Sequence, residues 1–282
     1  MSAPENTIDI LLLGSGGREH ALAAKLAESP LCGTLYIAPG NGGTLAAGEN
    51  VALDAEDPAA VADFARETGC GLVVIGPEAP LVAGVADAVR AAGIPCFGPG
   101  AEGAKLEGSK RFSKELMARA GIPTAAYGSF TDEESALAYV REQGAPVVVK
   151  ADGLAAGKGV VVALTLDEAL DAVHECFDGA FGAAGSTVVI EEMLTGPECT
   201  LLAFTDGKTV RPMATSQDHK RALEGDKGPN TGGMGVYSPV PIVTPEEHEE
   251  MCRILNETIA QANRESIDFR GCLYGGFMLT PA

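Results

Sequence analysis

Between Ile8 and Phe97, short apolar runs alternate with segments of helical periodicity. The apolar runs read IDILLL, LYIA, LVVI and PCF, and the segments between them cover residues 19–28, 58–68 and 81–92. Strands that alternate with helices in this way typically form a parallel sheet with helices on both faces. We therefore predict an α/β fold for the N-terminal part of the chain, with a domain boundary near residue 105.

A loop rich in glycine or proline follows three of the predicted strands. The loops are GSGGREH (14–20), APGNGG (38–43) and GPEAPL (76–81). Because ligands of parallel sheets bind at the carboxyl ends of the strands, we expect these loops to face one crevice. The first loop suits a phosphate, since glycines allow close backbone approach and Arg18 adds donors. A tight turn without a ligand is the structural alternative.

The same loop disfavours a nicotinamide-dependent oxidoreductase. The dinucleotide fingerprint requires a third glycine at the position where this chain has Glu19. Tight binding of NADH would restore that hypothesis.

Beyond residue 105 the pattern changes to α+β. A helix is predicted from about Ser109 to Ala120, and the strands predicted after it read VVVK, VVVALT, TVVIEE and CTLLAFT. Three Thr-x-x-Glu sequences predict capping boxes at helix N-termini. They are Thr131 with Glu134, Thr165 with Glu168, and Thr244 with Glu247.

A glycine-rich segment, KADGLAAGKGV, joins two of these strands and carries Lys150 and Lys158. It is not a Walker A loop, because no Ser or Thr follows the second lysine and no helix follows the loop. A flap between antiparallel strands can instead fold over nucleotide phosphates, which face its backbone N–H groups and its lysines. The alternative is a hairpin with solvated lysines.

Acidic and mixed-charge segments follow the flap. Glu191 to Leu194 are candidates for contacting an adenine, and Glu198 for accepting from ribose hydroxyls, although paired acids also occur at exposed strand ends. Further on, Asp218, His219, Lys220 and Arg221 form a charged cluster before a glycine-rich loop. His219 is a candidate general base, with a neutral hydrogen-bonding histidine as the alternative.

Composition restricts the partners of the chain. Acidic residues outnumber basic residues by 39 to 20, and the formal net charge of −19 would repel a phosphate backbone, so nucleic acid is not an expected partner. The seven cysteines show no CxxC or zinc-ligand spacing, which predicts buried thiols in a reducing cytoplasm. No membrane partner is expected, since no apolar run approaches the length of a spanning helix.

Eight motifs in order carry a resemblance to a known family. They are GSGGREHALA, APGNGGT, GPEAPLV, LEGSK, KADGLAAGKGV, EEMLTG, PMATSQDHKR and GPNTGGMGVYSP. In this order they resemble the phosphoribosylamine–glycine ligases, an ATP-grasp family, from Ile8 to about Met278. The resemblance implies a Rossmann-like parallel-sheet domain over residues 1–105. An incomplete α+β ATP-grasp domain over 106–282 would follow, with a lid at about 125–192.

The family joins glycine to 5-phosphoribosylamine with ATP and Mg²⁺ or Mn²⁺, through glycyl phosphate, in purine synthesis. Carried over motif by motif, the resemblance implies three groups of residues and a monomeric enzyme. The group for ATP is Lys110, Lys150, Gly153, Gly157, Lys158, Gly159, Glu191, Glu192, Leu194 and Glu198. The group for the phosphoribosyl substrate is Gly16, Gly17, Arg18, Asn41, Glu78 and Asn230. The group for the reacting centre is Asp218, Lys220 and Arg221.

The chain departs from the family at its end, LTPA. Family members continue into a strand whose Glu and Asn bind magnesium, and into a carboxyl-terminal domain. We therefore expect no metal ligand in this chain, and a fragment that binds nucleotide but catalyses poorly. The alternative function is a non-catalytic fragment that binds nucleotide and sugar phosphate.

Overall fold

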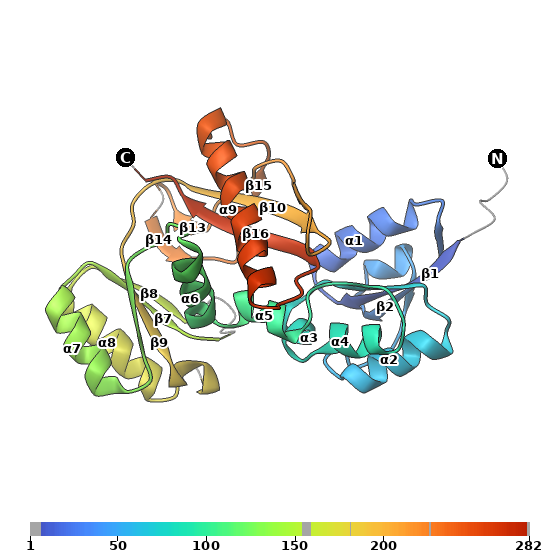
Figure 1. Cartoon of the computed structure of the whole chain (residues 1–282), viewed down its shortest axis with the longest axis horizontal. Coiled ribbons are helices and arrows are strands. Elements are labelled where there is room, and N and C mark those ends of the chain that lie inside the picture. Colours follow the sequence, from blue (N-terminus) through green and yellow to red (C-terminus); the bar gives the residue numbers. More distant parts are fainter. Residues whose placement is uncertain (1–6, 154–158, 181, 226, 281–282) are drawn as a thin grey trace. The chain divides into compact units, whose positions relative to one another are not determined.

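The computed structural model describes residues 7–153, 159–180, 182–225 and 227–280. The chain divides into two compact units (Figure 1). The first runs to Lys105 and includes Ser266–Gly271, and the second consists of Leu106–Glu265 and the segment from Cys272 onward. None of the helices in the described ranges has the length and apolar character needed to cross a membrane.

The first unit is built on a five-stranded sheet. Its elements are β1 (Ile8–Gly14), α1 (Gly17–Ala27), β2 (Cys32–Pro39), the 3₁₀ turn Thr44–Ala46, β3 (Glu49–Asn50), α2 (Pro58–Glu67), β4 (Leu72–Ile75), α3 (Glu78–Val82), α4 (Val85–Ala91), β5 (Cys96–Phe97) and the start of α5 (Ala101–Gly108). The strand order is β3-β2-β1-β4-β5, and every neighbouring pair is parallel. The predicted parallel sheet is confirmed.

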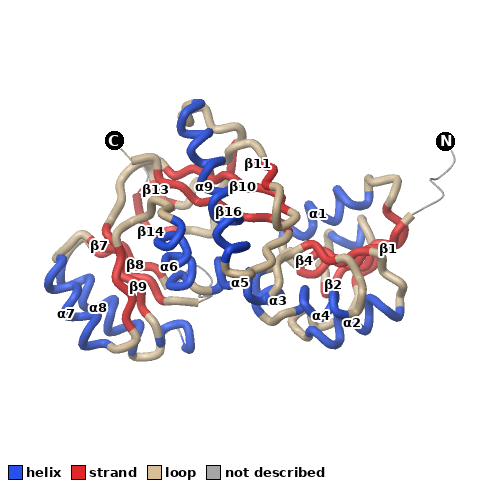
Figure 2. Tube along the Cα trace, viewed as in Figure 1, coloured by secondary structure: helices blue, strands red, loops and turns tan. Residues whose placement is uncertain are grey.

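Helices cover both faces of this sheet (Figure 2). Because side chains alternate along a strand, β1 contributes to two apolar clusters. Leu11 packs with Val61 of α2 and Val89 of α4. Leu12 packs on the opposite face with Ala23 of α1. The loops at the carboxyl ends of the strands are therefore held by a sheet that is buried on both sides.

One predicted helix of this unit is divided into two. The sequence predicts a single helix over 81–92, whereas the structure has α3 and α4, separated at Gly84. Gly84 has a φ of 86°, a left-handed conformation that interrupts the helix. The expectation of one continuous helix is wrong for this reason.

The second unit combines helices with mainly antiparallel strands. Its elements are α6 (Lys110–Ala120), β6 (Tyr127–Phe130), α7 (Glu133–Gln143), β7 (Val147–Ala151), β8 (Val160–Ala163), α8 (Leu166–Phe177), the 3₁₀ turn Gly182–Ser186, β9 (Val188–Glu192), β10 (Glu198–Thr205), β11 (Val210–Pro212), β12 (Gln217–Asp218), β13 (Arg221–Leu223), β14 (Lys227–Asn230), β15 (Val236–Tyr237), α9 (Pro245–Arg264) and β16 (Gly271–Met278). The predicted α+β character is confirmed.

A four-stranded sheet with the order β6-β9-β7-β8 forms one part of this unit. Its pairs are antiparallel, and α7 and α8 cover one face (Figure 1). Val149 and Ile190 belong to the core between the sheet and these helices. Their neighbours Lys150 and Glu191 therefore point to the opposite face of the sheet.

The predicted capping boxes have different outcomes. Thr165 and Thr244 each accept from the backbone N–H three residues on, and Glu168 and Glu247 reach back, so these two boxes are confirmed. The prediction for Thr131 is wrong, because α7 begins one residue later. Asp132 caps α7, with Oδ1 accepting from Ser135 N at 2.9 Å.

The remaining strands form smaller sheets. β11, β10 and β16 make a three-stranded sheet, while β12 pairs with β15 and β13 with β14. The last two pairs lie within residues 217–237, most of which the sequence indicated only as a charged cluster and a glycine-rich loop. Two short antiparallel ladders thus give this segment a defined backbone.

Candidate active site

A buried carboxylate with two lysines lies on the face of the four-stranded sheet that is opposite to α7 and α8. Lys150 Nζ is 2.8 Å from Oε2 of Glu191, and Lys114 Nζ is 3.2 Å from the same oxygen. Lys150 and Glu191 occupy diagonal positions on β7 and β9, a separation that long side chains can bridge. The structure therefore brings together two residues that the sequence proposed for ATP.

The base of the flap contacts the N-terminus of α6. Lys110 Nζ donates to the carbonyl of Gly153 at 3.1 Å. Asp152 accepts from the Ser109 hydroxyl and from the backbone N–H of Arg111, both at 2.9 Å. Because of these contacts Lys110 lies at the base of the flap.

Two further predicted glycines belong to the flap. Gly159 closes the hairpin, with its carbonyl accepting from Ala151 N at 2.8 Å. Gly157 and Lys158 lie outside the described residues.

Burial changes the basicity of the lysines at this site. Burial lowers the pKa of Lys110, and the charge of Lys150 adds to that effect, while Asp152 opposes it. The pKa of Lys114 is also lowered by burial, against the raising effect of Glu191. Cations that are partly desolvated interact strongly with an anion, because little water screens them.

Lys114 was not found by sequence analysis. It is buried, and its ammonium donates to Thr124 Oγ1 at 2.8 Å and to the carbonyl of Ala125 at 3.2 Å. The only local signal is its position four residues after Lys110, which places both lysines on one side of α6. A lysine in an amphipathic helix is usually exposed, so that spacing alone does not reveal burial.

The other residues proposed at the end of β9 have separate positions. Glu192 is exposed, and its Oε1 accepts from Ala126 N at 2.8 Å. Leu194 follows the strand and is half-buried. Neither residue contacts the two lysines that flank Glu191 in the described part of the chain.

A second charged group includes Lys220. Its Nζ is 3.1 Å from Oε2 of Glu198 and 3.5 Å from Oδ2 of Asp218. Burial lowers the pKa of Lys220, but the hydrogen bond and charge of Glu198 outweigh it, so the pKa is raised. The structure therefore joins Glu198, which the sequence assigned to ribose, to the proposed reacting centre.

Arg221 and Asn230 are opposite residues of the β13–β14 ladder. The Arg221 guanidinium donates to the carbonyl of Gly228 at 2.7 Å. Arg221 is thus fixed to its own hairpin. For Asn230, the structure describes only the backbone position on β14 opposite Arg221.

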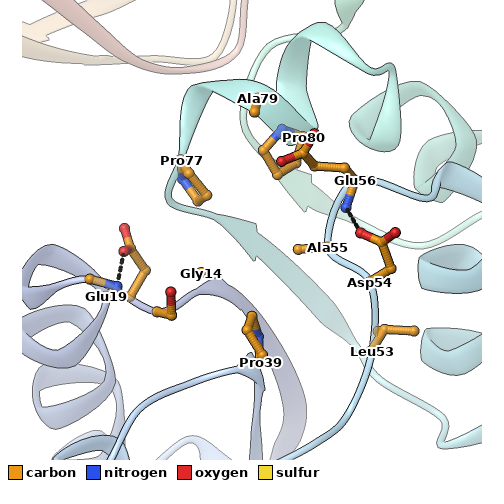
Figure 3. Close-up of a pocket in the computed structure, with 12 residues that line it drawn as sticks. Gly14, Glu19, Pro39, Leu53, Asp54, Ala55, Glu56, Pro77, Ala79 and Pro80 are labelled. Carbon is orange, nitrogen blue, oxygen red and sulfur yellow. Dashed lines mark hydrogen bonds between the residues drawn. The ribbon is translucent and has the colours of Figure 1, made fainter. Parts of the chain in front are cut away.

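A pocket of about 500 Å³ lies at the carboxyl ends of the strands in the first unit. Figure 3 shows the end of β1 on one side, the segment after β3 on the other, and Pro77 on a third. The residues that line it are Gly14, Ser15, Gly16, Glu19, Pro39, Leu53, Asp54, Ala55, Glu56, Pro77, Ala79 and Pro80. This lining of described residues carries three carboxylates and no Lys or Arg, so it suits hydroxyl or amine groups better than a phosphate.

Only Gly16, of the residues proposed for the phosphoribosyl group, lines this pocket. Arg18 Nη1 lies 3.0 Å from Oε1 of Glu78, so these two are paired with each other. Asn41 Nδ2 donates to the Ser15 carbonyl at 2.8 Å, which joins the second strand-end loop to the first. Gly17 begins α1, where the backbone N–H groups lack helical partners.

Glu19 organises the first loop. Its Oε2 accepts from Gly16 N at 2.9 Å, and its Oε1 accepts from Arg18 Nε at 2.6 Å. In the sequence, a glutamate at this position only disfavours the dinucleotide fingerprint. In the structure Glu19 is a buried carboxylate that holds the turn between β1 and α1 in place.

The described residues contain no preformed cluster of metal ligands. Among them, no group of three His, Cys, Asp or Glu side chains is placed to hold a metal ion. The nearest candidates, Glu198 and Asp218, are both directed at the Lys220 ammonium. We derive no chemical step through a metal.

Two family models match the chain over almost its whole length. Residues 8–107 match the phosphoribosylglycinamide synthetase N domain, and residues 108–282 match the phosphoribosylglycinamide synthetase ATP-grasp (A) domain. The chain belongs to the phosphoribosylglycinamide synthetase family. The family resemblance stated from the eight motifs is confirmed.

Curated relatives agree with this assignment. A phosphoribosylamine–glycine ligase of Allochromatium vinosum is 56% identical over 274 residues, which are 96% of this chain and 64% of the relative. The Brucella melitensis enzyme of the same name is 57% identical over 272 residues, with the same coverage of 96% and 64%. The chain therefore spans somewhat less than two thirds of the length of these relatives.

Solved structures confirm the fold. The crystal structure of a phosphoribosylamine–glycine ligase from Thermotoga maritima has a TM-score of 0.83 and 31% identity, and the match covers 97% of this chain and 66% of that one. The biotin carboxylase domain of a Hydrogenobacter thermophilus 2-oxoglutarate carboxylase, solved with MgADP, has a TM-score of 0.73 at 18% identity. The match covers 98% of this chain and 61% of that domain, and its likeness concerns the fold alone.

Proposed function

We propose that this chain provides the nucleotide-binding and sugar-phosphate-binding parts of a ligase that joins glycine to 5-phosphoribosylamine with ATP. The observation that carries the proposal is the meeting of Lys110, Lys150 and Gly153 at the base of a glycine-rich flap. The names of the relatives support the choice of substrates.

In this proposal the lysines of the second unit hold ATP. Lys110 and Lys150 neutralise phosphate charge, together with Lys158 and the glycines of the flap. Glu191, Glu192 and Leu194 contact the base, and Glu198 accepts from the ribose. Phosphoryl transfer depends mainly on positioning and charge neutralisation, so a partly buried set of lysines supports this role.

The first unit would hold the phosphoribosyl substrate. The carboxylates of the pocket accept from ribose hydroxyls, while Gly16, Gly17 and Arg18 offer donors to the phosphate. Asn41 and Glu78 hold the strand-end loops and Arg18 in place.

The reaction proceeds in two steps. A carboxylate oxygen of glycine attacks the γ-phosphorus of ATP, the bridging bond to ADP breaks, and glycyl phosphate forms. The amine nitrogen of phosphoribosylamine then attacks the carbonyl carbon, the amide forms, and phosphate leaves as the nitrogen loses a proton. Asp218, Lys220, Arg221 and Asn230 are proposed to surround the reacting atoms, with Lys220 stabilising the negative charge that develops. Mg²⁺ or Mn²⁺ would neutralise phosphate charge when bound.

A non-catalytic nucleotide-binding fragment is the second candidate. It requires only the contacts of Lys110 and Lys150 at the base of the flap. The two candidates differ in one observable, the release of phosphate when ATP, magnesium, glycine and phosphoribosylamine are all present.

Calorimetric titration with ATP tests the shared part of both candidates. We expect wild-type protein to bind ATP and Lys150→Ala to bind at least about tenfold more weakly, because a charge-assisted contact is lost. Lys208→Ala is the matched control, since Lys208 is exposed in the same unit. A folded wild-type chain that binds no ATP would refute the proposal.

A further inference from the structure

The function proposed for the second unit does not use Lys114, although this lysine contacts the same carboxylate oxygen of Glu191 as Lys150. Lys114 belongs to α6, one turn after Lys110, and is only 6% exposed. Its ammonium lies 5.4 Å from the ring centre of Tyr127 and contacts Glu191 at 3.2 Å. A buried ammonium is costly unless it is paired and hydrogen-bonded, and Lys114 meets both conditions through Glu191, Thr124 and Ala125.

Glu191 is only half satisfied. Its Oε2 receives both Lys114 and Lys150, whereas its Oε1 is buried and has no hydrogen-bond partner among the described residues. A buried carboxylate oxygen without a donor loses its hydration and gains nothing in return. It is therefore placed to accept a hydrogen bond from a ligand that enters the site.

The two lysines differ in their freedom to move. The side chain of Lys150 is 25% exposed, and Glu191 is the only ion-pair partner it has in the described part of the chain. The side chain of Lys114 is 8% exposed and is held by Thr124 Oγ1 and the Ala125 carbonyl. An anion in the site can draw Lys150 away from Glu191, but Lys114 cannot follow.

We propose that Lys114 is a positioning residue for nucleotide binding, which keeps the Glu191 carboxylate paired and oriented when Lys150 turns to the nucleotide. This inference rests on the proposed binding of ATP at Lys110 and Lys150. Without Lys114, the movement of Lys150 would leave a buried carboxylate with no cation, and that cost would be subtracted from the affinity for ATP.

The contacts of Lys114 also connect two elements. Thr124 and Ala125 lie between α6 and β6, where the chain enters the four-stranded sheet. Lys114 thus links this connection to β9, which carries Glu191. A purely structural role would follow from those hydrogen bonds alone, whereas the proposed role requires the positive charge.

A double-mutant cycle separates these roles. ATP affinity is measured by calorimetry for the full chain as wild type, Lys114→Met, Glu191→Gln and the double variant. We expect Lys114→Met to weaken ATP binding by about tenfold in the wild-type background, and by less than about twofold with Glu191→Gln, because no carboxylate charge then remains to be held. Lys208→Met is the control for the loss of an exposed lysine.

Lys114→Gln provides the second variant, because its amide can still donate to the Ala125 carbonyl but carries no charge. We expect it to lose as much affinity as Lys114→Met, and circular dichroism checks that each variant is folded. Two results would overturn the role of Lys114 and leave the proposed ATP binding intact. One is an ATP affinity of Lys114→Gln within twofold of wild type. The other is an equal loss of affinity from Lys114→Met in both backgrounds. Failure of folded wild-type protein to bind ATP would overturn the proposed function together with it.

Discussion

The carboxylate of Glu19 occupies the space beside Gly76, where an added Cβ would lie 2.3 Å from Glu19 Oε1. Glu19 belongs to α1, and Gly76 directly follows β4, so the contact joins two strand-end loops of the first unit. Glu19 is 3% exposed and is held by Gly16 and Arg18. A glycine is favoured at position 76 because a side chain there would meet the Glu19 carboxylate, which is held by its hydrogen bonds to Gly16 and Arg18.

Gly76→Ala should destabilise the first unit. The added methyl group must displace Glu19 from its hydrogen bonds, and overpacking of this kind costs about 1–3 kcal/mol. Urea unfolding of the variant measures the loss. Gly42→Ala is the control, since a Cβ at Gly42 would meet nothing within 4 Å. Equal unfolding midpoints for the two variants would contradict the contact.

Substitution of the helix caps tests the corrected start of α7. Thr165→Ala, Thr244→Ala and Asp132→Ala should each lower the free energy of unfolding by about 1 kcal/mol, because each removes an N-cap acceptor. Thr131→Ala should have little effect, since Asp132 is the cap. The comparison is made by urea unfolding at neutral pH, and a larger loss from Thr131→Ala than from Asp132→Ala would restore the predicted capping box.

Local patterns explain why most elements could be predicted and this cap could not. The parallel sheet follows from alternating apolar runs, a signal contained within each segment. In the sequence TDEES, however, Thr131 and Asp132 are both good caps, each with an acceptor suited to the N–H three residues on. Only the position at which the chain leaves β6 decides between them, and that is a property of the folded unit.

The candidate site was predicted unevenly for a similar reason. Glycine-rich loops and charged segments indicate where ligands bind, so Lys150 and Glu191 could be selected from the residues themselves, whereas Lys110 was selected through the resemblance to the family. Lys114 has no such signal, since its burial results from α6 packing beside β6 and β9. The pairing of Glu198 with Lys220 likewise depends on the turn that returns the chain between them.

The affinity for ATP should fall at a pH lower than the one at which an exposed lysine loses its proton. Burial lowers the pKa of Lys110 despite the opposing charge of Asp152. The protonated form attracts phosphate, so affinity is complete below this lowered pKa and declines as the pH rises through it. Calorimetry between about pH 7 and 10 measures the decline. Lys110→Arg should remain charged throughout this range and give a flatter profile. Identical profiles would show that Lys110 does not titrate in contact with the nucleotide.

Cys176 should be unreactive in the native chain. Burial raises its pKa to about 11, and its side chain packs in the core between α8 and the four-stranded sheet. The thiolate is the reactive form, so both the low thiolate fraction and the lack of access slow alkylation. Iodoacetamide at about pH 8, followed by mass spectrometry, should leave Cys176 unmodified in native protein but modify all seven cysteines in urea. Alkylation of native Cys176 at the rate seen in urea would mean that this core opens readily, because a thiol enclosed on both sides can react only after the sheet and helix separate.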